Sequence, residues 1–452
     1  MKQEPENQIE EIMREWYGSR LAVILESIVI GCSTGFVIVL FRLALNRADQ
    51  LRSEIYKALP GLPIKYTALL TAVMIIAGLL LGLANVARPM VSGGGVSQIK
   101  GIIQGRLKAD WKTELPLKWF ASFLAISVGL SFGWEGPSVM LAAYTGIAIL
   151  KIFKRPQRER NTLLASSTAA GLSAAFNAPL AGVLFMLEEM RVTMTPMSIA
   201  CAMGASMTGD LVAGHFFGLQ PVYHFRSITV MPIKFFPWIV LLGVICALLG
   251  DMFKRSLYLS QDFFKFLKIP VAVRPILPVL LSIPLSFYLY ETTGGGHPLI
   301  NSLSIDNRPI NLLLLLLFVN LLFSSFCAGS GASGGIFLPF ITCGALAGNT
   351  FGKILTECGL VGADYQLNFM ILGMAAVFSS VVKAPVTGIV LVLEMTANYN
   401  HLTSLVLVSL CSFVTAELIA SRPVYDVLLS RILEDAGIGE KGKNAGNAFT
   451  GG

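Results

Sequence analysis

Charged residues are scarce in this sequence. Asp, Glu, Lys and Arg make up 13% of the 452 residues, whereas a soluble domain carries about 25%. Hydrophobic residues reach 54%, and the mean hydropathy is +0.69. Since about 20 apolar residues suffice to cross a bilayer, this composition predicts an all-α integral membrane protein. The apolar stretches of membrane length, or nearly so, are Leu21–Leu45, Tyr66–Ala87, Phe235–Leu249 with its flanks, Ile276–Tyr290, Ile310–Phe326 and Leu402–Ala420.

Several signatures of catalysis and metal binding are also missing. The seven cysteines form no CxxC pair, and the four histidines share no ligand spacing. There is no phosphate-binding GxxxxGKS loop, no nucleophile elbow and no HExxH motif. We therefore expect no metal, no cofactor and no enzymatic activity. Residues 1–20 are too acidic for a cleavable signal peptide and are expected to form a cytoplasmic segment.

The basic residues indicate a topology rather than a nucleic-acid partner. The net charge of +7 comes from Lys and Arg in loops beside the spans, above all in 106–112, 151–160 and 254–274. The loops around 217–232, 291–309 and 397–402 contain almost none. Because cytoplasmic loops are enriched in Lys and Arg, we expect the basic loops and both termini in the cytoplasm. The protein is expected to be a multi-pass protein of the cell (inner or plasma) membrane.

An internal repeat is visible in the sequence. Residues 178–188 and 384–394 both read APxxGxxxxLE, and each follows an Ala-Ala pair. Residues 133–137 and 335–339 both read GxxxP, at nearly the same offset. The apolar stretches near these motifs are interrupted by Gly and Pro, which a membrane tolerates only where protein or a cavity surrounds the backbone. Such interruptions in two halves point to a transport site near the midplane, with halves at roughly 66–216 and 271–420.

Three Gly-rich breaks stand at expected helix starts, at residues 92–97, 133–137 and 334–339. Helix N-termini expose unpaired N–H groups and about half a positive charge. Several of them together bind an anion without a full cationic side chain. The alternative is that each break is an ordinary turn in a crowded bundle.

Glu135 lies inside the second break, with no Lys or Arg nearby in the sequence. A carboxylate within a membrane is costly and is a functional candidate by default. Its negative charge can occupy the place that anions use, and protonation would release it.

Two further positions are weaker candidates. Glu189 has no counterpart in the repeat, whereas Glu188 matches Glu394 and is expected to be structural. Glu189 is thus a candidate for a second proton-handling group, although a plain helix-end carboxylate is an equal alternative. Tyr425, after Pro423, offers a hydroxyl to an anion, but tyrosines are common at membrane interfaces.

These motifs resemble those of the CLC family of chloride channels and chloride/proton antiporters. Residues 133–137 are similar to its G(K/R)EGP motif and 335–339 to its GxFxP motif, while 174–190 and 391–398 also resemble it. The resemblance covers roughly residues 20–432. It implies an inverted-repeat bundle of about 17–18 helices, many of them broken, in a membrane domain at 21–432, and a homodimer in the lipid bilayer. A tail at 433–452, expected to be disordered, leaves no room for CBS domains.

The resemblance also implies residue roles. Glu135 matches the gating glutamate, Glu189 the inner proton-transfer glutamate of the antiporters, and Tyr425 the tyrosine at the central chloride. Ile336 and Phe337 match residues that offer backbone N–H groups to the anion. The implied anion-binding set is Gly94, Gly95, Val96, Gly136, Ile336, Phe337 and Tyr425.

The sequence departs from the family's pattern at two places. Gly94 replaces a serine that contacts the anion, and Trp134 replaces the basic residue before the glutamate. The first change removes one hydroxyl donor, for which Ser92 or Ser97 are candidate substitutes. The predicted function is proton-coupled antiport of chloride or a related small monovalent anion. A passive anion channel and a fluoride/proton exchanger of the same fold remain alternatives, and a membrane-embedded enzyme is the alternative from another class.

Overall fold

Helices make up most of the chain. The computed structural model describes residues 5–61, 63–223, 225 and 229–438. This part contains seventeen α-helices and no strand, which confirms the predicted fold class. The helices are α1 (Pro5–Ala58), α2 (Ile64–Ala87), α3 (Val96–Ile103), α4 (Trp111–Ser127), α5 (Glu135–Phe153), α6 (Gln157–Phe176), α7 (Pro179–Glu188), α8 (Pro196–Phe217), α9 (Phe236–Phe266), α10 (Ile276–Tyr288), α11 (His297–Ile305), α12 (Ile310–Gly329), α13 (Phe337–Glu357), α14 (Gln366–Val382), α15 (Pro385–Thr396), α16 (Leu402–Leu418) and α17 (Val424–Asp435).

Seven helices of the described chain are long and apolar enough to cross a membrane, and the protein is a multi-pass membrane protein. Five of the six predicted spans fall in them, in α1, α2, α9, α12 and α16. The sixth stretch, Ile276–Tyr290, forms one of the shorter apolar helices. Helix α10 has 13 residues, and at 1.5 Å per residue it is shorter than a hydrocarbon core of about 30 Å.

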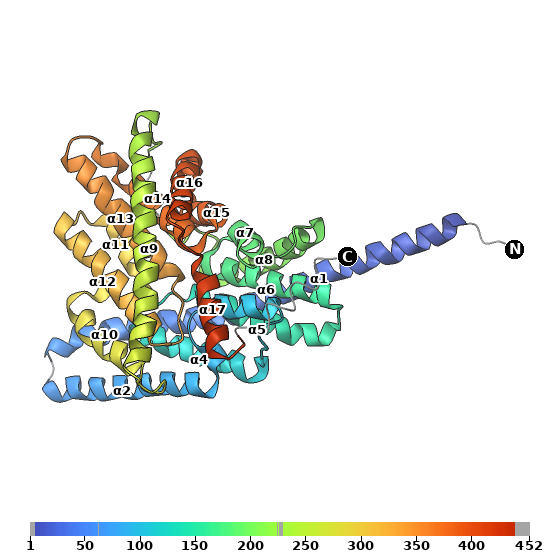
Figure 1. Ribbon diagram of the computed structural model, residues 1–452, viewed down its shortest axis with the longest axis horizontal. Helices are drawn as coiled ribbons and strands as arrows, with labels where there is room; N and C mark the ends of the chain where they lie inside the picture. Colours follow the sequence, from blue (N-terminus) through green and yellow to red (C-terminus); the bar gives the residue numbers. More distant parts are fainter. Residues whose placement is uncertain (1–4, 62, 224, 226–228, 439–452) are drawn as a thin grey trace.

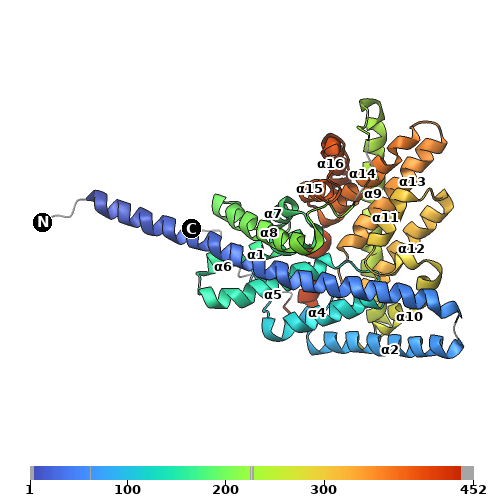
Figure 2. The same cartoon turned by 180° about the vertical axis from the view of Figure 1, so that it is seen from behind.

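The prediction missed two spanning helices, α5 and α14. Their most apolar windows are 72% and 83% buried by protein, against 28% for α2. Helix α2 lies along one edge of the molecule and α1 runs across one face (Figures 1 and 2). Lipid-facing helices need continuous apolar surface, while helices enclosed by other helices accept Gly, Ser and Thr. The hydropathy of α5 and α14 is therefore lower, and they are harder to recognise.

Close packing at the centre depends on small residues. A methyl group added to Gly344 of α13 would lie 2.3 Å from the carbonyl oxygen of Gly373 in α14, and one added to Gly348 would lie 2.0 Å from that of Phe369. Small residues let membrane helices approach closely where side chains would otherwise separate the backbones. The α13–α14 contact is thereby fixed by glycines four residues apart.

The two copies of the repeat have the same local structure. Asn177 follows the end of α6 and Lys383 follows the end of α14, and both are in the left-handed region, with φ of 53° and 67°. In each copy an Ala-Pro step then begins the next short helix, with the proline in the first turn, where its missing N–H costs nothing. The duplicated sequence thus folds into a duplicated helix–turn–helix.

The two short helices cap each other. Glu188 at the end of α7 accepts hydrogen bonds from the Val386 and Thr387 N–H groups at 3.3 and 2.7 Å, at the start of α15. Glu394, near the end of α15, accepts from the first turn of α7, where the Leu180 and Ala181 N–H groups lie 3.0 and 2.8 Å away. End-to-start contacts in both directions require antiparallel helices. The two halves are therefore inverted relative to each other.

Candidate functional site

The three Gly-rich breaks meet at one place inside the protein. Gly133 and Gly335 exchange two backbone hydrogen bonds in an antiparallel bridge, with N···O distances of 2.8 and 3.1 Å. The break at residues 92–97 joins them, because the Gly334 N–H donates to the Gly93 carbonyl oxygen at 3.1 Å. Segments more than 200 residues apart in the sequence are thus hydrogen-bonded to each other.

Glycine is required at this meeting point because the backbones approach so closely. A methyl group added to Gly136 would lie 2.9 Å from the Cα of Gly335 and 3.1 Å from the Gly94 carbonyl oxygen. Such contacts are shorter than those that real Cβ atoms make. At Gly94, in contrast, the added methyl would be 3.5 Å from its nearest neighbours, an ordinary contact.

Three helices begin at this junction. Helix α3 starts at Val96 after Gly95, whose φ is 97°; α5 starts at Glu135, and α13 starts at Phe337 after Ile336. The first N–H groups of each helix have no acceptor within the helix, and they carry the positive end of its dipole. Their convergence is an arrangement suited to a small anion.

The Phe337 ring holds the start of α13 in place. It is fully buried and contacts the rings of Phe176, Phe185 and Phe378, with centroid distances of 5.5, 6.3 and 4.8 Å. These rings come from α6, α7 and α14, so aromatic packing from both halves fixes the position of one of the three helix N-termini.

Lys118, from the middle of α4, brings its amino group to the break at residues 92–97. Its side chain is completely buried. Its ammonium group donates to the carbonyl oxygens of Val91, at 2.9 Å, and of Gly93. By holding these carbonyls, Lys118 fixes the loop that leads into α3.

Glu135 is fully buried at the start of α5. Its Oε1 lies 3.1 Å from Nε2 of His297, the first residue of α11. Its Oε2 is buried and has no hydrogen-bond partner. Helix α1 brings Arg42 into electrostatic range of this carboxyl group. A buried carboxyl with one open oxygen is poised either to take a proton or to move toward other donors.

His297 is itself held by two aromatic residues. Its Nδ1 lies 2.9 Å from the hydroxyl oxygen of Tyr223, which is fully buried. The indole of Trp134 stacks on the imidazole, with centroids 4.2 Å apart and planes 23° apart. Glu135, His297 and Tyr223 therefore form a continuous hydrogen-bonded chain.

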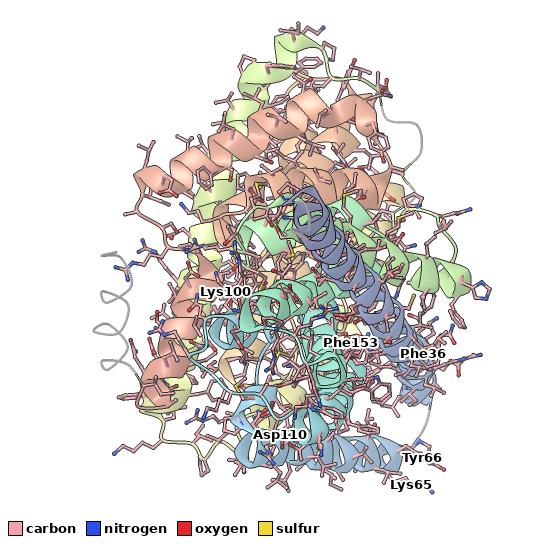
Figure 3. All side chains as sticks on the ribbon, turned by 90° about the vertical axis from the view of Figure 1, so that its right-hand side faces the viewer. Phe36, Lys65, Tyr66, Lys100, Asp110 and Phe153 are labelled. Carbon is pink, nitrogen blue, oxygen red and sulfur yellow. The ribbon has the colours of Figure 1, made fainter. Side chains whose placement is uncertain are left out.

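A second cluster of charged residues surrounds Glu189. The side chain of Glu189 is nearly fully buried, and its Oε1 accepts a hydrogen bond from the Lys100 ammonium at 2.8 Å. Lys100 of α3 also bonds Asp426 of α17, and Arg191 lies 2.8 Å from the other oxygen of Asp426. Lys100 lies within the body of the protein, whereas Lys65 and Tyr66 lie at its edge (Figure 3).

Tyr425 lies within electrostatic range of both carboxyl groups. It is buried at the first turn of α17, and it is close enough to both Glu189 and Glu135 to feel their charges. Helix α17 packs against α3, so the tyrosine belongs to the same region as the first Gly-rich break.

Comparison with known proteins identifies the family to which this architecture belongs. Residues 73–417 match the family described as voltage gated chloride channel. The chain belongs to the voltage-gated chloride channel family. The chain is 33% identical over 432 residues to the H(+)/Cl(−) exchange transporter ClcA of Vibrio parahaemolyticus, covering 92% of this chain and 90% of that protein. It is 32% identical over 429 residues to the ClcA transporter of Citrobacter koseri, covering 91% and 89%.

Solved structures of the family have the same fold. A slow cyanobacterial Cl⁻/H⁺ antiporter superposes with a TM-score of 0.85 at 28% sequence identity, covering 91% of this chain and 98% of that one. A CLC-type fluoride/proton antiporter gives a TM-score of 0.71 at 21% identity, covering 90% and 97%. The second likeness shows the fold alone.

The residues predicted from the family's motifs lie in this region. Gly94, Gly136 and Ile336 are brought into contact across the three breaks, with Gly95, Val96 and Phe337 at the helix starts. Ser92 is not a substitute for the missing hydroxyl, because its Oγ donates to the Gly331 carbonyl oxygen at 2.8 Å. Glu188 and Glu394 are cross-capping residues, as the repeat indicated.

Sequence reasoning missed four residues that the structure brings to these sites. Lys118 and Lys100 could have been found as isolated cations in apolar helices, where an unexplained charge needs a partner. His297 and Tyr223 are not conspicuous in the sequence. The contact between His297 and Glu135 and the contact between His297 and Tyr223 each join segments that are distant in the sequence.

Proposed function

We propose that this protein exchanges chloride, or a related small monovalent anion, for protons across a membrane. The observation that carries the proposal is the meeting of three helix N-termini around the buried, half-bonded carboxyl of Glu135. The relatives named as H(+)/Cl(−) exchange transporters support it.

The anion is held by backbone N–H groups, which attract it without the strong binding of a full cation. The proposed set is Gly94, Gly95, Val96, Gly136, Ile336, Phe337 and Tyr425. Trapping is avoided because dipoles of about half a charge hold an ion less tightly than a lysine in direct contact. Lys118 acts indirectly, because its side chain binds the carbonyl oxygens of Val91 and Gly93 and so positions the loop that leads into α3.

Glu135 couples the two ions. As an anion it competes with chloride for the N–H groups; as a neutral acid it has no charge with which to compete. Each cycle therefore links the presence of an anion in the site to a proton on Glu135. A channel of the same fold would let the anion pass without this link.

Glu189 is proposed to handle the proton on the other side of the anion site. Burial favours the neutral acid of Glu189, whereas the bond to Lys100 favours the charged carboxylate, so opening or closing of this ion pair changes how readily Glu189 takes up a proton. Tyr425, which is buried within electrostatic range of both glutamates, is proposed to donate its hydroxyl to the anion.

We further propose that two copies of the chain associate in the bilayer of the cell membrane, with both termini in the cytoplasm. Helices α7 and α15 pack together, and the repeat-related residues Leu180 and Val386 are 55% and 47% exposed. Together they offer an apolar face to a second copy. Chemical cross-linking in membranes should yield a dimer, and a purely monomeric product would contradict this.

The deciding experiment measures chloride and proton movement together in liposomes. Given a chloride gradient, the wild-type protein should move protons against their own gradient. Glu135→Gln, which cannot lose a proton, should keep chloride flux and abolish proton movement. Chloride flux without any anion-driven proton movement by the wild type would establish the passive channel instead.

The identity of the anion is tested in the same liposomes with chloride, nitrate and fluoride. Gly94 leaves one hydroxyl fewer at the site, and a net hydrogen bond is worth about 1 kcal/mol. That is enough to change the preference among anions. Preferred transport of fluoride would identify the fluoride/proton exchanger.

A further inference from the structure

The hydrogen-bonded chain of Glu135, His297 and Tyr223 joins three separate segments. Glu135 begins α5, His297 begins α11, and Tyr223 lies between α8 and α9. The distances are 3.1 Å from Oε1 of Glu135 to Nε2 of His297 and 2.9 Å from Nδ1 of His297 to the Tyr223 hydroxyl oxygen. Both imidazole nitrogens of His297 are thus hydrogen-bonded. One partner is a carboxyl group, which can exchange a proton, and the other is a hydroxyl group, which can reorient its hydrogen bond.

The solvent exposure of the three residues in this hydrogen-bonded chain differs. Glu135 and Tyr223 are completely buried, while 11% of the His297 side chain is exposed. A proton from solution therefore meets the imidazole first. Oε1 of Glu135 is hydrogen-bonded to His297, and the other oxygen is buried without a partner. On this side of Glu135, the imidazole is the group in contact with both water and the carboxyl.

The remaining charged or titratable neighbours do not offer another route. Arg42 of α1 lies within electrostatic range of Glu135, but a guanidinium does not release its proton. Trp134 has a donor N–H and no acceptor. Helix α13, which packs against α11, brings the uncharged Thr342 close to Gly296. Tyr425 is near enough to Glu135 to feel its charge, but it is buried. Among the described groups around Glu135, His297 alone is partly exposed and can both accept and pass on a proton.

The chain keeps its hydrogen bonds in both protonation states of Glu135. With the carboxylate charged, Nε2–H donates to Oε1 and the Tyr223 hydroxyl donates to Nδ1. With the carboxyl neutral, its O–H donates to Nε2 and Nδ1–H donates to the hydroxyl oxygen. A hydroxyl can donate or accept, so Tyr223 accommodates both tautomers of the imidazole.

We propose that His297 is the proton-transfer residue that loads Glu135 from the side on which α11 begins. When the Tyr223 hydroxyl moves off Nδ1, a hydronium ion in the solution gives its proton to Nδ1 and becomes water, which forms imidazolium, and the hydroxyl returns as the acceptor of the new N–H. The Nε2–H bond then breaks as the O–H bond of Glu135 forms, and the neutral imidazole keeps its proton on Nδ1. The Trp134 ring, stacked on the imidazole, keeps its plane aligned and favours the cation through cation–π attraction.

This inference rests on the proposed exchange of anions for protons. Its test uses the full chain in phosphatidylethanolamine/phosphatidylglycerol liposomes with a chloride gradient, at equal pH on both sides between pH 5 and 8. The wild-type rate of proton movement should fall in a step as the pH rises from 5 to 8, because only a protonated imidazole can pass on its proton. His297→Phe, which keeps a ring against Trp134, should slow proton movement at pH 5 at least tenfold and lose this pH step.

Two further variants separate proton transfer from hydrogen bonding. His297→Gln can hydrogen-bond but cannot become a cation, so it should also lack the pH step. Tyr223→Phe removes the partner of Nδ1 and should slow proton movement by about two- to fivefold, a change of up to about 1 kcal/mol, while the pH step remains. Wild-type rates and an unchanged pH profile in His297→Phe would overturn the proposal.

The Glu135→Gln background provides the control for folding. Chloride flux should be the same, within twofold, in Glu135→Gln and in Glu135→Gln with His297→Phe. Loss of chloride flux in the double variant would overturn the proposal, because His297 would then be needed for the anion path. If the wild type itself moves no protons, the proposed antiport fails; if it does and His297→Phe is unchanged, only the role of His297 fails.

Discussion

At the scale of single residues, Gly94 is the position where a side chain can be added to the site. The neighbouring atoms lie 3.5 Å from an added Cβ, and the backbone there is not in the left-handed region. Gly136 and Gly335 have no such space. One glycine of the junction is thus open to substitution, while two others are required by close backbone contact.

Gly94→Ser should therefore fold and bind chloride more tightly. One additional hydroxyl donor is worth about 1 kcal/mol or somewhat more to an ion, so a five- to tenfold decrease in the chloride Kd is expected by calorimetry. Gly94→Ala is the matched control, since it adds the same Cβ without the hydroxyl. An equal gain in Gly94→Ala would contradict the hydrogen-bond explanation.

The ion pair of Glu189 and Lys100 is also best tested residue by residue. Removal of one partner leaves a buried charge unpaired, which costs about 3–5 kcal/mol. Lys100→Met should therefore lower the unfolding temperature strongly. Adding Glu189→Gln should restore most of it, because the unpaired carboxylate is removed as well.

A double-mutant cycle by thermal unfolding gives the coupling between the two residues, expected to be at least about 1 kcal/mol. Arg191→Met offers a control in the same cluster, since that side chain is 63% exposed and exposed ion pairs contribute about 0–1 kcal/mol. Additive effects of Lys100→Met and Glu189→Gln would mean that the buried pair does not hold the cluster together.

At the scale of helices, the cross-capping of α7 and α15 predicts equivalent effects at two distant positions. Glu188→Gln and Glu394→Gln each remove a carboxylate that accepts from two backbone N–H groups at a helix start. Hydrogen bonds to charged groups contribute about 1.5–3 kcal/mol. Both variants should therefore unfold at lower temperature, by similar amounts, with an unchanged ratio of chloride to protons.

Asp435→Asn is the matched control, because Asp435 pairs with Lys265 at the surface and the two side chains are 61% and 46% exposed. Its unfolding temperature should stay close to that of the wild type. An altered transport ratio in Glu188→Gln, with stability intact, would show that this residue takes part in proton transfer.

The helix-level predictions from sequence differed in success for a physical reason. The outer helices α2 and α12 were recognisable because lipid requires a continuous apolar surface. Helices α5 and α14 were missed because protein surrounds them, and α10 is shorter than its apolar stretch, which continues past the end of the helix at Tyr288. Hydropathy reports contact with lipid better than it reports crossing of the membrane.

At the scale of the whole molecule, the distribution of basic loops predicts the orientation in the membrane. With the exposed Cys32 and Cys358 replaced by serine, Lys154→Cys and Ile305→Cys introduce thiols into loops of opposite predicted sides. A membrane-impermeant maleimide should label Ile305→Cys in intact cells. It should label Lys154→Cys only after permeabilisation, and the reverse pattern would invert the topology.

The inverted repeat explains how one site can be built from both halves. Antiparallel copies bring equivalent Gly-rich breaks face to face, as in the bridge between Gly133 and Gly335. The break at residues 92–97 joins them through the hydrogen bond between Gly334 and Gly93. A parallel arrangement of the same copies could not form the reciprocal contacts of Glu188 and Glu394.

The membrane class, the duplication and the Gly-rich helix starts can be predicted from the residues alone, because composition, periodicity and the φ requirements of glycine are local properties of the chain. Glu135 is also recognisable, since a carboxylate among apolar residues is conspicuous without any structure. Which side chains face these groups depends on the three-dimensional packing. The contacts of Lys118 with Gly93, Lys100 with Glu189 and His297 with Glu135 join distant segments, and such proximity depends on how the helices pack.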